Sequence, residues 1–266
     1  MPHKLKIGIV GCGAIGSSLA DAIKKDFSKQ AQLAALYDLD LSKIKNKKLA
    51  VASLNKLIER SELVIEAASA KVSWPIARQV LNQGRDMMIM SVGGVASHAK
   101  ELRNLAQRKG ARVYIPSGAI CGLDGLKASG LKKIKRVMLT TRKNPISLKG
   151  NAYLAAKGID LSRIAKETIV FQGSAKQAVK FFPQNINVAA VLSLAGIGQE
   201  KTRVRLIADP NVHRNIHEVT IEAEAANIFT RAENILHPQN PKTSYLAPLS
   251  AIAVLKQILE PLKIGT

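Results

Sequence analysis

The sequence predicts an α/β fold that begins with a doubly wound parallel sheet and continues into a second, α+β part. Three observations support this prediction. Short β-branched runs alternate with stretches of helical spacing up to about residue 120. A glycine-rich turn, Gly11–Gly16, joins the first of these runs to the first helical stretch. Beyond residue 120, several runs alternate apolar and polar residues with fewer helices between them, which indicates a different architecture.

In the first half, each element follows from a local signal. Helices are expected where apolar residues recur every three to four positions, as for Leu19, Ile23 and Phe27, and where Gly84 and Gly110 supply C-terminal stops. The expected strands are 5–10, 32–38, 63–69, 86–94 and 111–119, and the expected helices are 17–27, 54–60, 74–83 and 97–108. Strands and helices that alternate in this way imply a parallel sheet covered on both faces.

In the second half, the strand signal is a period of two. Val204 and Leu206 alternate with Arg203 and Arg205, which predicts a sheet with one face in solvent or at a subunit contact. The expected strands are 134–141, 168–173, 202–208 and 217–225, and the expected helices are 174–182 and 185–196. After a polar stretch at 237–244, an apolar helix over 246–262 needs cover from another element.

Length and composition place the chain among folded proteins. With 266 residues, 47% hydrophobic and 22% charged, it has enough apolar material for a core, and no run approaches the roughly 18 apolar residues of a membrane helix. The first strand starts at residue 5, which leaves no room for a signal peptide, and two cysteines are too few for a disulfide framework. We therefore expect a cytoplasmic protein with no membrane partner.

The chain is strongly basic, with 40 Lys and Arg residues against 19 Asp and Glu and a formal net charge of +21. Such a surface attracts polyanions, but only 4% of residues are aromatic, and the basic residues lie in short clusters such as 43–48 and 132–136. We therefore do not expect specific nucleic-acid binding. A basic enzyme that acts on acidic metabolites explains the same charge.

The strongest motif is Gly-x-Gly-x-x-Gly between the first strand and the first helix. Gly11 allows the tight turn, Gly13 lets the backbone approach a pyrophosphate, and Gly16 lets helix and strand pack closely. The N–H groups that open the helix at Ala14 and Ile15 favour a phosphate. The motif predicts a Rossmann-type dinucleotide-binding domain, with a glycine turn that binds nothing as the alternative.

Asp38 strengthens this prediction, because it lies 22 residues after Gly16 at the end of the second expected strand. A carboxylate there accepts hydrogen bonds from the adenosine ribose hydroxyls and repels a 2′-phosphate, so NAD is the expected cofactor. Lys43 and Lys45 lie close in the sequence and leave NADP open as the alternative. The simpler alternative for Asp38 is an ordinary turn residue.

A nicotinamide enzyme also needs a group that handles a proton, and histidine titrates nearest to neutral pH. Four of the five histidines lie near the terminus, at a helix start or in polar loops, and we expect them to be solvated: His3, His98, His213 and His237. His217 differs, because it lies in an expected strand, where the pleat fixes side-chain direction. Spacing alone leaves it either catalytic or a hydrogen-bonded sheet histidine.

Three further residues have competing interpretations. Asn187 lies in the first turn of a helix, where capping is the simplest role. Cys121 closes the last parallel strand, near which cofactors bind, but no basic neighbour would activate its thiol, so we expect a packing or cofactor-contact residue. Cys12, inside the glycine turn, is expected to be a small buried filler. No metal site is expected.

Six segments, in this order and spacing, together resemble the L-aspartate dehydrogenase family. They are VGCGAIG (10–16), SVGG (91–94), PSGAICG (116–122), PQNINVAAVLSLAG (183–196), ADP followed by NIHEV (208–219) and NPKTS (240–244). The resemblance covers nearly the whole chain. It implies a Rossmann domain over 1–120, a substrate domain over 121–240 whose mixed sheet also forms the contact of a homodimer, and a C-terminal helix over 241–266 that returns to the first domain.

The resemblance also implies roles for individual residues. The family's catalytic histidine falls on His217, and its cofactor-contacting asparagine falls on Asn187. Cys121 takes the place of a small residue, where an alanine would be expected, and is close enough in size to keep the cofactor contact. The implied reaction oxidises L-aspartate to iminoaspartate, which hydrolyses to oxaloacetate and ammonia, and it supplies NAD biosynthesis.

Two alternatives stay open at this point. One is another Rossmann reductase of aspartate-derived metabolites, although the sequence lacks an HHxxKxDAPSG-like stretch of the dihydrodipicolinate type. The other is a non-enzymatic, NAD-binding redox sensor with a basic nucleic-acid-binding surface, although the sequence has no helix-turn-helix or zinc-finger pattern.

Overall fold

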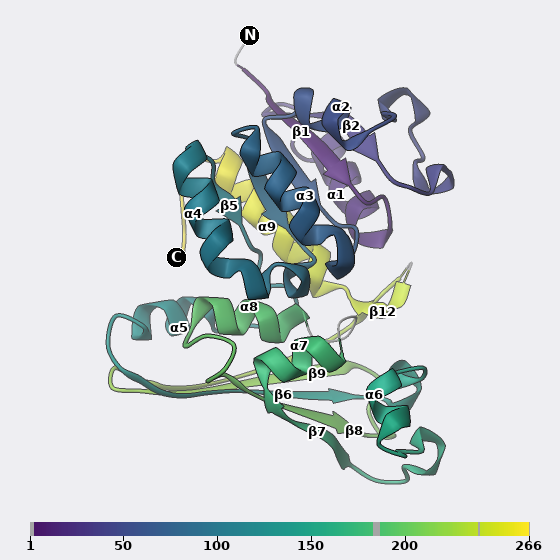
Figure 1. Cartoon of the computed structure of the whole chain (residues 1–266), viewed down its shortest axis with the longest axis vertical. Helices are drawn as coiled ribbons and strands as arrows, with labels where there is room; N and C mark the ends of the chain where they lie inside the picture. Colours follow the sequence, from purple (N-terminus) through teal and green to yellow (C-terminus); the bar gives the residue numbers. More distant parts are fainter. Residues whose placement is uncertain (1–2, 183–186, 239, 266) are drawn as a thin grey trace. The chain divides into compact units, whose positions relative to one another are not determined.

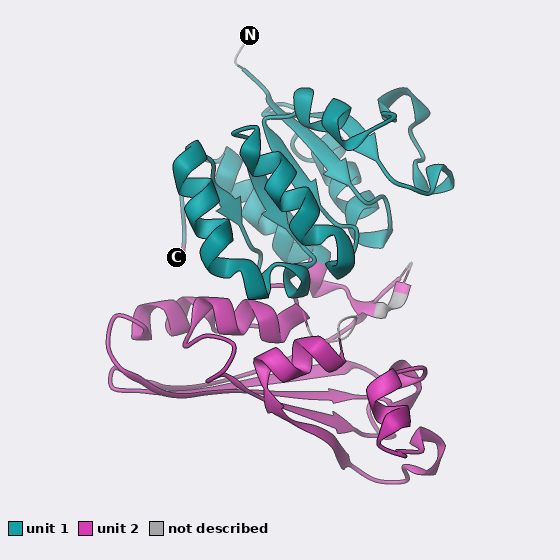
Figure 2. Cartoon of the chain, viewed as in Figure 1, with its two compact units in different colours: residues 1–116, 248–264 teal, residues 117–247, 265–266 magenta. Residues whose placement is uncertain are grey.

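The computed structural model describes residues 3–182, 187–238 and 240–265, with the backbone alone for residues 241 and 242. The chain forms two compact units (Figure 2). Unit 1 comprises the residues up to Pro116 together with Pro248–Ile264, and unit 2 comprises Ser117–Ala247 with Gly265. Within the described ranges, no helix is both long and apolar enough to cross a membrane.

Unit 1 is built on a five-stranded parallel sheet in the order β2-β1-β3-β4-β5 (Figure 1). Its strands are β1 (Leu5–Val10), β2 (Ala31–Tyr37), β3 (Leu63–Glu66), β4 (Asp86–Ile89) and β5 (Val113–Tyr114). The strand order reverses beside β1, so the carboxyl ends of β1 and β3 flank the switch point of the sheet. Open α/β sheets bind their ligands at such a point.

Helices cover both faces of this sheet, as the alternation of elements predicts. They are α1 (Ala14–Lys25), α2 (Leu54–Glu59), α3 (Ala70–Asn82), α4 (Ala99–Lys109) and α9 (Leu246–Leu259). Ile7, Ile9 and Ile65 of the sheet share a core cluster with Ile23 of α1 and Leu255 of α9. Helices α3 and α4 lie on the opposite face (Figure 1). The prediction of a doubly wound parallel sheet is confirmed.

Unit 2 contains a five-stranded mixed sheet in the order β10-β9-β6-β8-β7, in which β6 and β8 run parallel and the other neighbours antiparallel. The strands are β6 (Ile134–Lys143), β7 (Thr168–Ser174), β8 (Arg203–Ala208), β9 (Asn215–Ala223) and β10 (Asn227–Asn234). The helices are α5 (Leu123–Ser129), α6 (Ala152–Ala156), α7 (Ala175–Phe181) and α8 (Asn187–Ala195). A separate two-stranded sheet pairs β11 (Leu236–His237) with β12 (Asn240–Ser244).

One face of the mixed sheet, here called the inner face, packs against α5, α7 and α8 (Figure 1). It follows the predicted period of two, since Val204 and Leu206 are fully buried and Arg203 is exposed. On the central strand β6, Val137 and Leu139 belong to the same core. Because side chains alternate between the two faces of a strand, every second residue of these strands lies on the inner face, toward the helices.

The structure differs from the expected elements in several places. Helices α5 and α6 are missing from the expected set, and β5 covers only Val113–Tyr114 of the expected strand 111–119. The polar stretch 237–244 is not a loop, because it holds the last residue of β11 and all of β12, and these two strands pair with each other. Strand β10 is missing from the expected set, because its side chains are mostly exposed or half-buried and give little apolar signal. Helix α3 begins at Ala70, four residues before the expected start at Trp74. Proline is typical of a first helical turn, but in this helix Pro75 lies in the interior.

Candidate functional site

The glycine turn follows β1 and has a geometry that side chains would block. Gly11 has φ +91°, and a Cβ there would lie 2.5 Å from the carbonyl of Ala67. A Cβ on Gly16 would lie 1.9 Å from the oxygen of Gly11. At Gly13, by contrast, an added Cβ would meet nothing within 4 Å. The backbone at Gly13 therefore faces open space that a ligand can approach closely.

Helix α1 begins directly after this open position. Its N-cap is Gly13, which has no side chain to bond the N–H groups of the first turn. The N–H groups of Ala14, Ile15 and Gly16 thus have no acceptor within the helix. The positive end of the helix dipole lies at the same place. A pyrophosphate fits this cradle, because it supplies acceptors for the N–H groups and meets no side chain at Gly13.

Asp38 lies one residue after β2 and supports the glycine turn with its carboxylate. Its Oδ2 accepts the N–H of Cys12 at 2.7 Å, and its Oδ1 accepts the N–H of Asp40 at 2.9 Å. Each oxygen still has a lone pair for another donor. Asp38 is therefore a turn residue that braces the phosphate cradle, and its bond to a ribose hydroxyl stays a prediction.

A cleft of about 630 Å³ adjoins the glycine turn. Its walls include Gly11, Gly13 and Asp38, with Lys43 beyond β2. The residues of α3 that line it are Val72, Pro75, Ile76 and Gln79. A largely apolar wall opposite backbone N–H groups suits a nucleotide, whose base is flat and apolar and whose phosphates are charged.

A buried carboxylate stabilises the same edge of the sheet. Glu66 is the last residue of β3 and is fully buried. Its Oε1 accepts the N–H of Ala68 at 2.8 Å, and its Oε2 accepts the hydroxyl of Ser73 at 2.8 Å and the N–H of Ser91 at 3.2 Å. Burial raises the pKa of Glu66, an effect that these donors offset only in part. Glu66 ties together the segments that follow β3 and β4.

Cys12 lies inside the glycine turn and is buried. Burial and the nearby carboxylate of Asp38 raise the pKa of its thiol to about 11. The thiol therefore stays protonated at neutral pH and is a poor nucleophile. This agrees with the expectation that Cys12 fills space.

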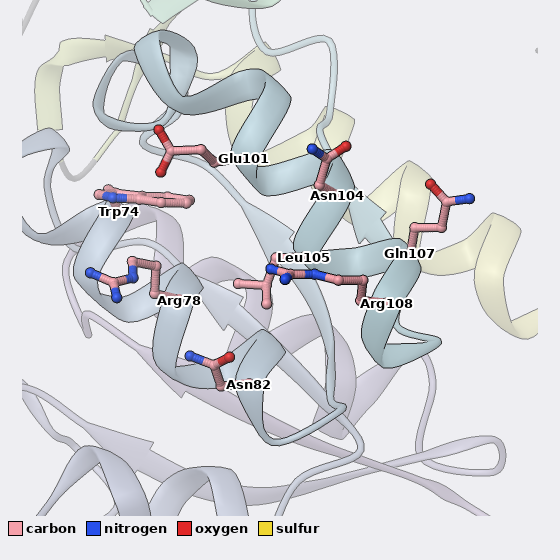
Figure 3. Close-up of a pocket in the computed structure, with 8 residues that line it drawn as sticks. All are labelled: Trp74, Arg78, Asn82, Glu101, Asn104, Leu105, Gln107 and Arg108. Atoms are coloured by element: carbon pink, nitrogen blue, oxygen red, sulfur yellow. The ribbon is translucent and has the colours of Figure 1, made fainter.

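A second hollow of unit 1, of about 610 Å³, lies between α3 and α4 (Figure 3). Its lining residues are Trp74, Arg78, Asn82, Glu101, Asn104, Leu105, Gln107 and Arg108. Apart from Leu105 and the half-buried Trp74, these residues are exposed. The ring of Trp74 stacks on His98, with centroids 4.4 Å apart. Because its polar groups are solvated, this groove gives no reason to place a ligand there.

In unit 2, His217 of β9 lies directly opposite Thr141 of β6 on the inner face. Both residues are buried, with exposed fractions of 4% and 0%. The hydroxyl of Thr141 and Nδ1 of His217 share a hydrogen bond of 2.9 Å, which fixes the orientation of the ring. Burial, with help from the charge of Lys143, lowers the pKa of His217 to about 3. The imidazole is therefore neutral at neutral pH.

Three buried polar residues lie at the same end of the inner face, namely Lys143, Asn215 and Asn234. Asn215 pairs with Asn234 across β9 and β10. The amide nitrogen of Asn215 donates to the hydroxyl of Ser244 at 3.3 Å, which brings the segment 240–244 to this end of the sheet. Lys143 was missed because the expected strand ends at residue 141, two positions too early.

The other two predicted cofactor contacts also belong to unit 2. Asn187 is the first residue of α8 and is half-buried, and residues 183–186 of the same motif lie outside the described residues. Cys121 is exposed. A Cβ on Gly118 would lie 3.8 Å from Val188, so the turn that leads to Cys121 lies next to the start of α8. The two motifs are therefore neighbours in space, although about 65 residues separate them in the sequence.

One of the histidine expectations is wrong. His3 and His213 are exposed, as expected, whereas His237 is only 3% exposed. It is buried because β11 pairs with β12, and its ring meets Tyr245 edge to face at 5.3 Å. Among the described residues, no group of three or more His, Cys, Asp or Glu side chains is placed to hold a metal ion.

Two family models match the chain in succession. Residues 11–116 match the NAD-binding domain of homoserine dehydrogenase, and residues 124–258 match the C-terminal domain of aspartate dehydrogenase. The first match contains the glycine turn and Asp38, and the second contains Thr141 and His217. The cofactor is therefore a pyridine nucleotide.

Relatives of known name match over the full length. The L-aspartate dehydrogenase of Methanosarcina barkeri is 48% identical over 98% of this chain and 100% of its own, and that of Methanocella arvoryzae is 44% identical over 98% and 99%. The crystal structure of aspartate dehydrogenase from Thermotoga maritima superposes with a TM-score of 0.79 at 28% identity, covering 99% of this chain and 100% of its own. Both domain matches, the full-length relatives and the fold agree, and the chain therefore belongs to the aspartate dehydrogenase family.

Proposed function

We propose that the protein oxidises L-aspartate to iminoaspartate with NAD, and that the imine then hydrolyses to oxaloacetate and ammonia. The observation that carries this proposal is the buried pair of Thr141 and His217, in which a 2.9 Å hydrogen bond holds a neutral imidazole. The pair lies within the residues that match the aspartate dehydrogenase domain. The relatives at 48% and 44% identity are L-aspartate dehydrogenases, which supports this substrate.

For the cofactor, we propose NAD in preference to NADP. The N–H groups that open α1 would bind the pyrophosphate and Asp38 the adenosine ribose, with Asn187 and Cys121 as further contacts. Asp38 and Asp40 place two carboxylates in the cleft, which disfavours an added phosphate. Lys43, which is ion-paired with Asp40 at 3.7 Å, is the residue through which NADP would be accepted. When bound, the nicotinamide ring accepts a hydride from the substrate carbon.

The residues of unit 2 would handle the proton. The α-ammonium of aspartate must lose a proton before its nitrogen can form the C=N bond as the hydride leaves Cα. A neutral His217 whose Nδ1–H donates to Thr141 keeps the lone pair of Nε2 for that proton. The two carboxylates of the substrate raise the pKa of His217 when they bind, because nearby negative charge stabilises the imidazolium. The ring that is neutral in the free protein thereby becomes a competent base in the complex.

The proposal is tested by NADH formation from a panel of L-amino acids with the purified full-length protein. Aspartate is expected to give the highest kcat/KM. Alanine lacks the side-chain carboxylate and glutamate is one methylene longer, so both are expected to be far slower. A panel in which aspartate gives no NADH, or in which homoserine gives more than aspartate, contradicts the proposal.

We further infer a cytoplasmic homodimer that supplies NAD biosynthesis. Cys12 and Cys121 are both free thiols, which is consistent with a reducing compartment. The side of the mixed sheet opposite the inner face carries the ion pair of Arg142 with Glu218, and Phe229 of the edge strand β10 is 64% exposed. Aromatic residues and arginine are enriched in subunit contacts. Sedimentation at the mass of a single chain contradicts the homodimer.

A further inference from the structure

The inner face of the mixed sheet changes from apolar to polar along β6. Val137 and Leu139 face the helices, and the next residues on that side of the strand are Thr141 and Lys143. Thr141 pairs with His217, and Arg142 pairs with Ile216. Position 143 therefore faces Asn215, which in turn pairs with Asn234 on β10. Lys143, Asn215 and Asn234 form a second polar row beside the first, and both rows are buried.

Lys143 is exceptional among the basic residues of this chain. The sequence has 40 Lys and Arg residues, yet among those that the structure describes Lys143 alone is buried, at 5% exposed. An ammonium group in such a place loses its hydration, and desolvation lowers the pKa of Lys143 to about 8. Its charge also lowers the pKa of His217. An anion that enters beside these two residues would reverse both effects, because it stabilises both positive charges.

Asn234 supplies a second and independent observation. Its Nδ2 donates to the carbonyl oxygens of Ala119 at 3.1 Å and Asn215 at 3.3 Å. Its Oδ1 is buried and has no hydrogen-bond partner among the described residues. A buried acceptor without a donor is costly, and few native groups are left in this state. The amide oxygen is therefore suited to accept an N–H group from a ligand.

We propose that Lys143 is a substrate-binding residue, whose ammonium group takes one carboxylate of the dicarboxylic amino acid while Oδ1 of Asn234 accepts an N–H of its amino group. This assignment rests on the proposed function and identifies the cation that a diacid substrate requires. It makes the site selective, because a substrate without the second carboxylate offers Lys143 no anion to bind.

Succinate is the probe, because it has two carboxylates and cannot be oxidised by this chemistry. Its affinity is measured by calorimetry in the presence of NAD, for the wild type and for Lys143→Met. The variant is expected to bind succinate roughly 10²-fold more weakly and to raise the KM for aspartate to a similar extent, which is the usual loss when one partner of a buried charge pair is removed. The affinity for NAD alone is expected to stay unchanged.

Two controls separate binding from folding. Lys135→Met makes the same substitution at an exposed position of the same strand and is expected to leave succinate affinity unchanged. The melting temperature of Lys143→Met, measured beside that of the wild type, shows whether the variant keeps its fold. Lys143→Gln, which is neutral but polar, gives the same comparison if Lys143→Met does not fold.

The outcomes distinguish this assignment from the proposed function. Equal succinate affinity in the wild type and in the folded neutral variants overturns the role of Lys143, even when the wild type oxidises aspartate. A Lys143→Met protein that melts well below the wild type and still binds succinate gives Lys143 a structural role instead. A wild type that binds succinate but forms no NADH from aspartate overturns the proposed reaction and leaves the dicarboxylate site in place.

Discussion

Replacing Thr141 by valine removes the hydrogen bond to His217 while keeping the shape of the side chain. The bond is 2.9 Å long and both residues are buried, so no solvent can replace the lost partner of Nδ1. Leaving one buried polar group unsatisfied costs about 1–3 kcal/mol. If this bond holds the ring in its productive orientation, the same free energy corresponds to a fall in kcat of roughly 5- to 150-fold, at about 1.4 kcal/mol for each factor of ten.

The assay is steady-state NADH formation from aspartate, with the affinity for NAD measured in parallel. Thr140→Val is the matched control, because Thr140 precedes Thr141 on β6 and faces away from the inner face. We expect Thr141→Val to lower kcat and leave NAD affinity unchanged, and Thr140→Val to change neither. A Thr141→Val enzyme with the kcat of the wild type would refute the claim that this bond orients His217.

Three other predictions address the cofactor cleft and the buried histidine. Gly13→Val is expected to weaken NADH binding by at least about tenfold while the protein stays folded, because the valine side chain enters the open space that faces the start of α1. NADH affinity is measured by fluorescence, and an unchanged affinity would show that the N–H groups at the start of α1 do not bind the cofactor. Asp38→Ala is expected to lower the NAD preference in the ratio of kcat/KM values for NAD and NADP, and an unchanged ratio argues against a ribose contact. The pKa of His217 falls from 6.5 to about 3 on folding. Between these two pH values the folded state binds fewer protons than the unfolded state. The unfolding free energy should therefore fall as the pH drops from 6.5 to about 3, by up to about 1.4 kcal/mol per pH unit. The unfolding free energy of His217→Gln, measured by chemical denaturation at a series of pH values, should depend less steeply on pH than that of the wild type. The same pH dependence in both proteins would mean that the ring is not buried as a neutral base.

The geometry of the cleft at the glycine turn could be predicted because its determinants are local in the sequence. The glycine turn, the start of α1 and Asp38 all lie within the first 38 residues, and their spacing alone sets their relative positions on a strand, a turn and a helix. Glu66 could not be predicted. It ends a strand that looks uniformly apolar, and its burial depends on donors from Ser73 and Ser91, which only the folded sheet brings to it.

The polar end of the inner face was predicted only in part. His217 was found from its place in a strand and from the family resemblance, but its neighbours come from β6 and β10, far away in the sequence. The segment T-T-R-K at 140–143 looks like the charged end of a strand, and nothing local indicates that Lys143 is buried while Arg142 pairs with Glu218 on the opposite side of the sheet. The expectation that His237 is solvated is wrong because no local signal shows that its strand pairs with β12, which buries the ring.

The central claim, that His217 exchanges the proton in aspartate oxidation, is tested most directly by the kcat of His217→Ala with aspartate and NAD. A positioned acid or base contributes roughly 10²–10⁴-fold, so we expect kcat to fall by that factor while the dissociation constant for NAD stays at the wild-type value. Turnover of aspartate at the wild-type rate in this variant would contradict the claim.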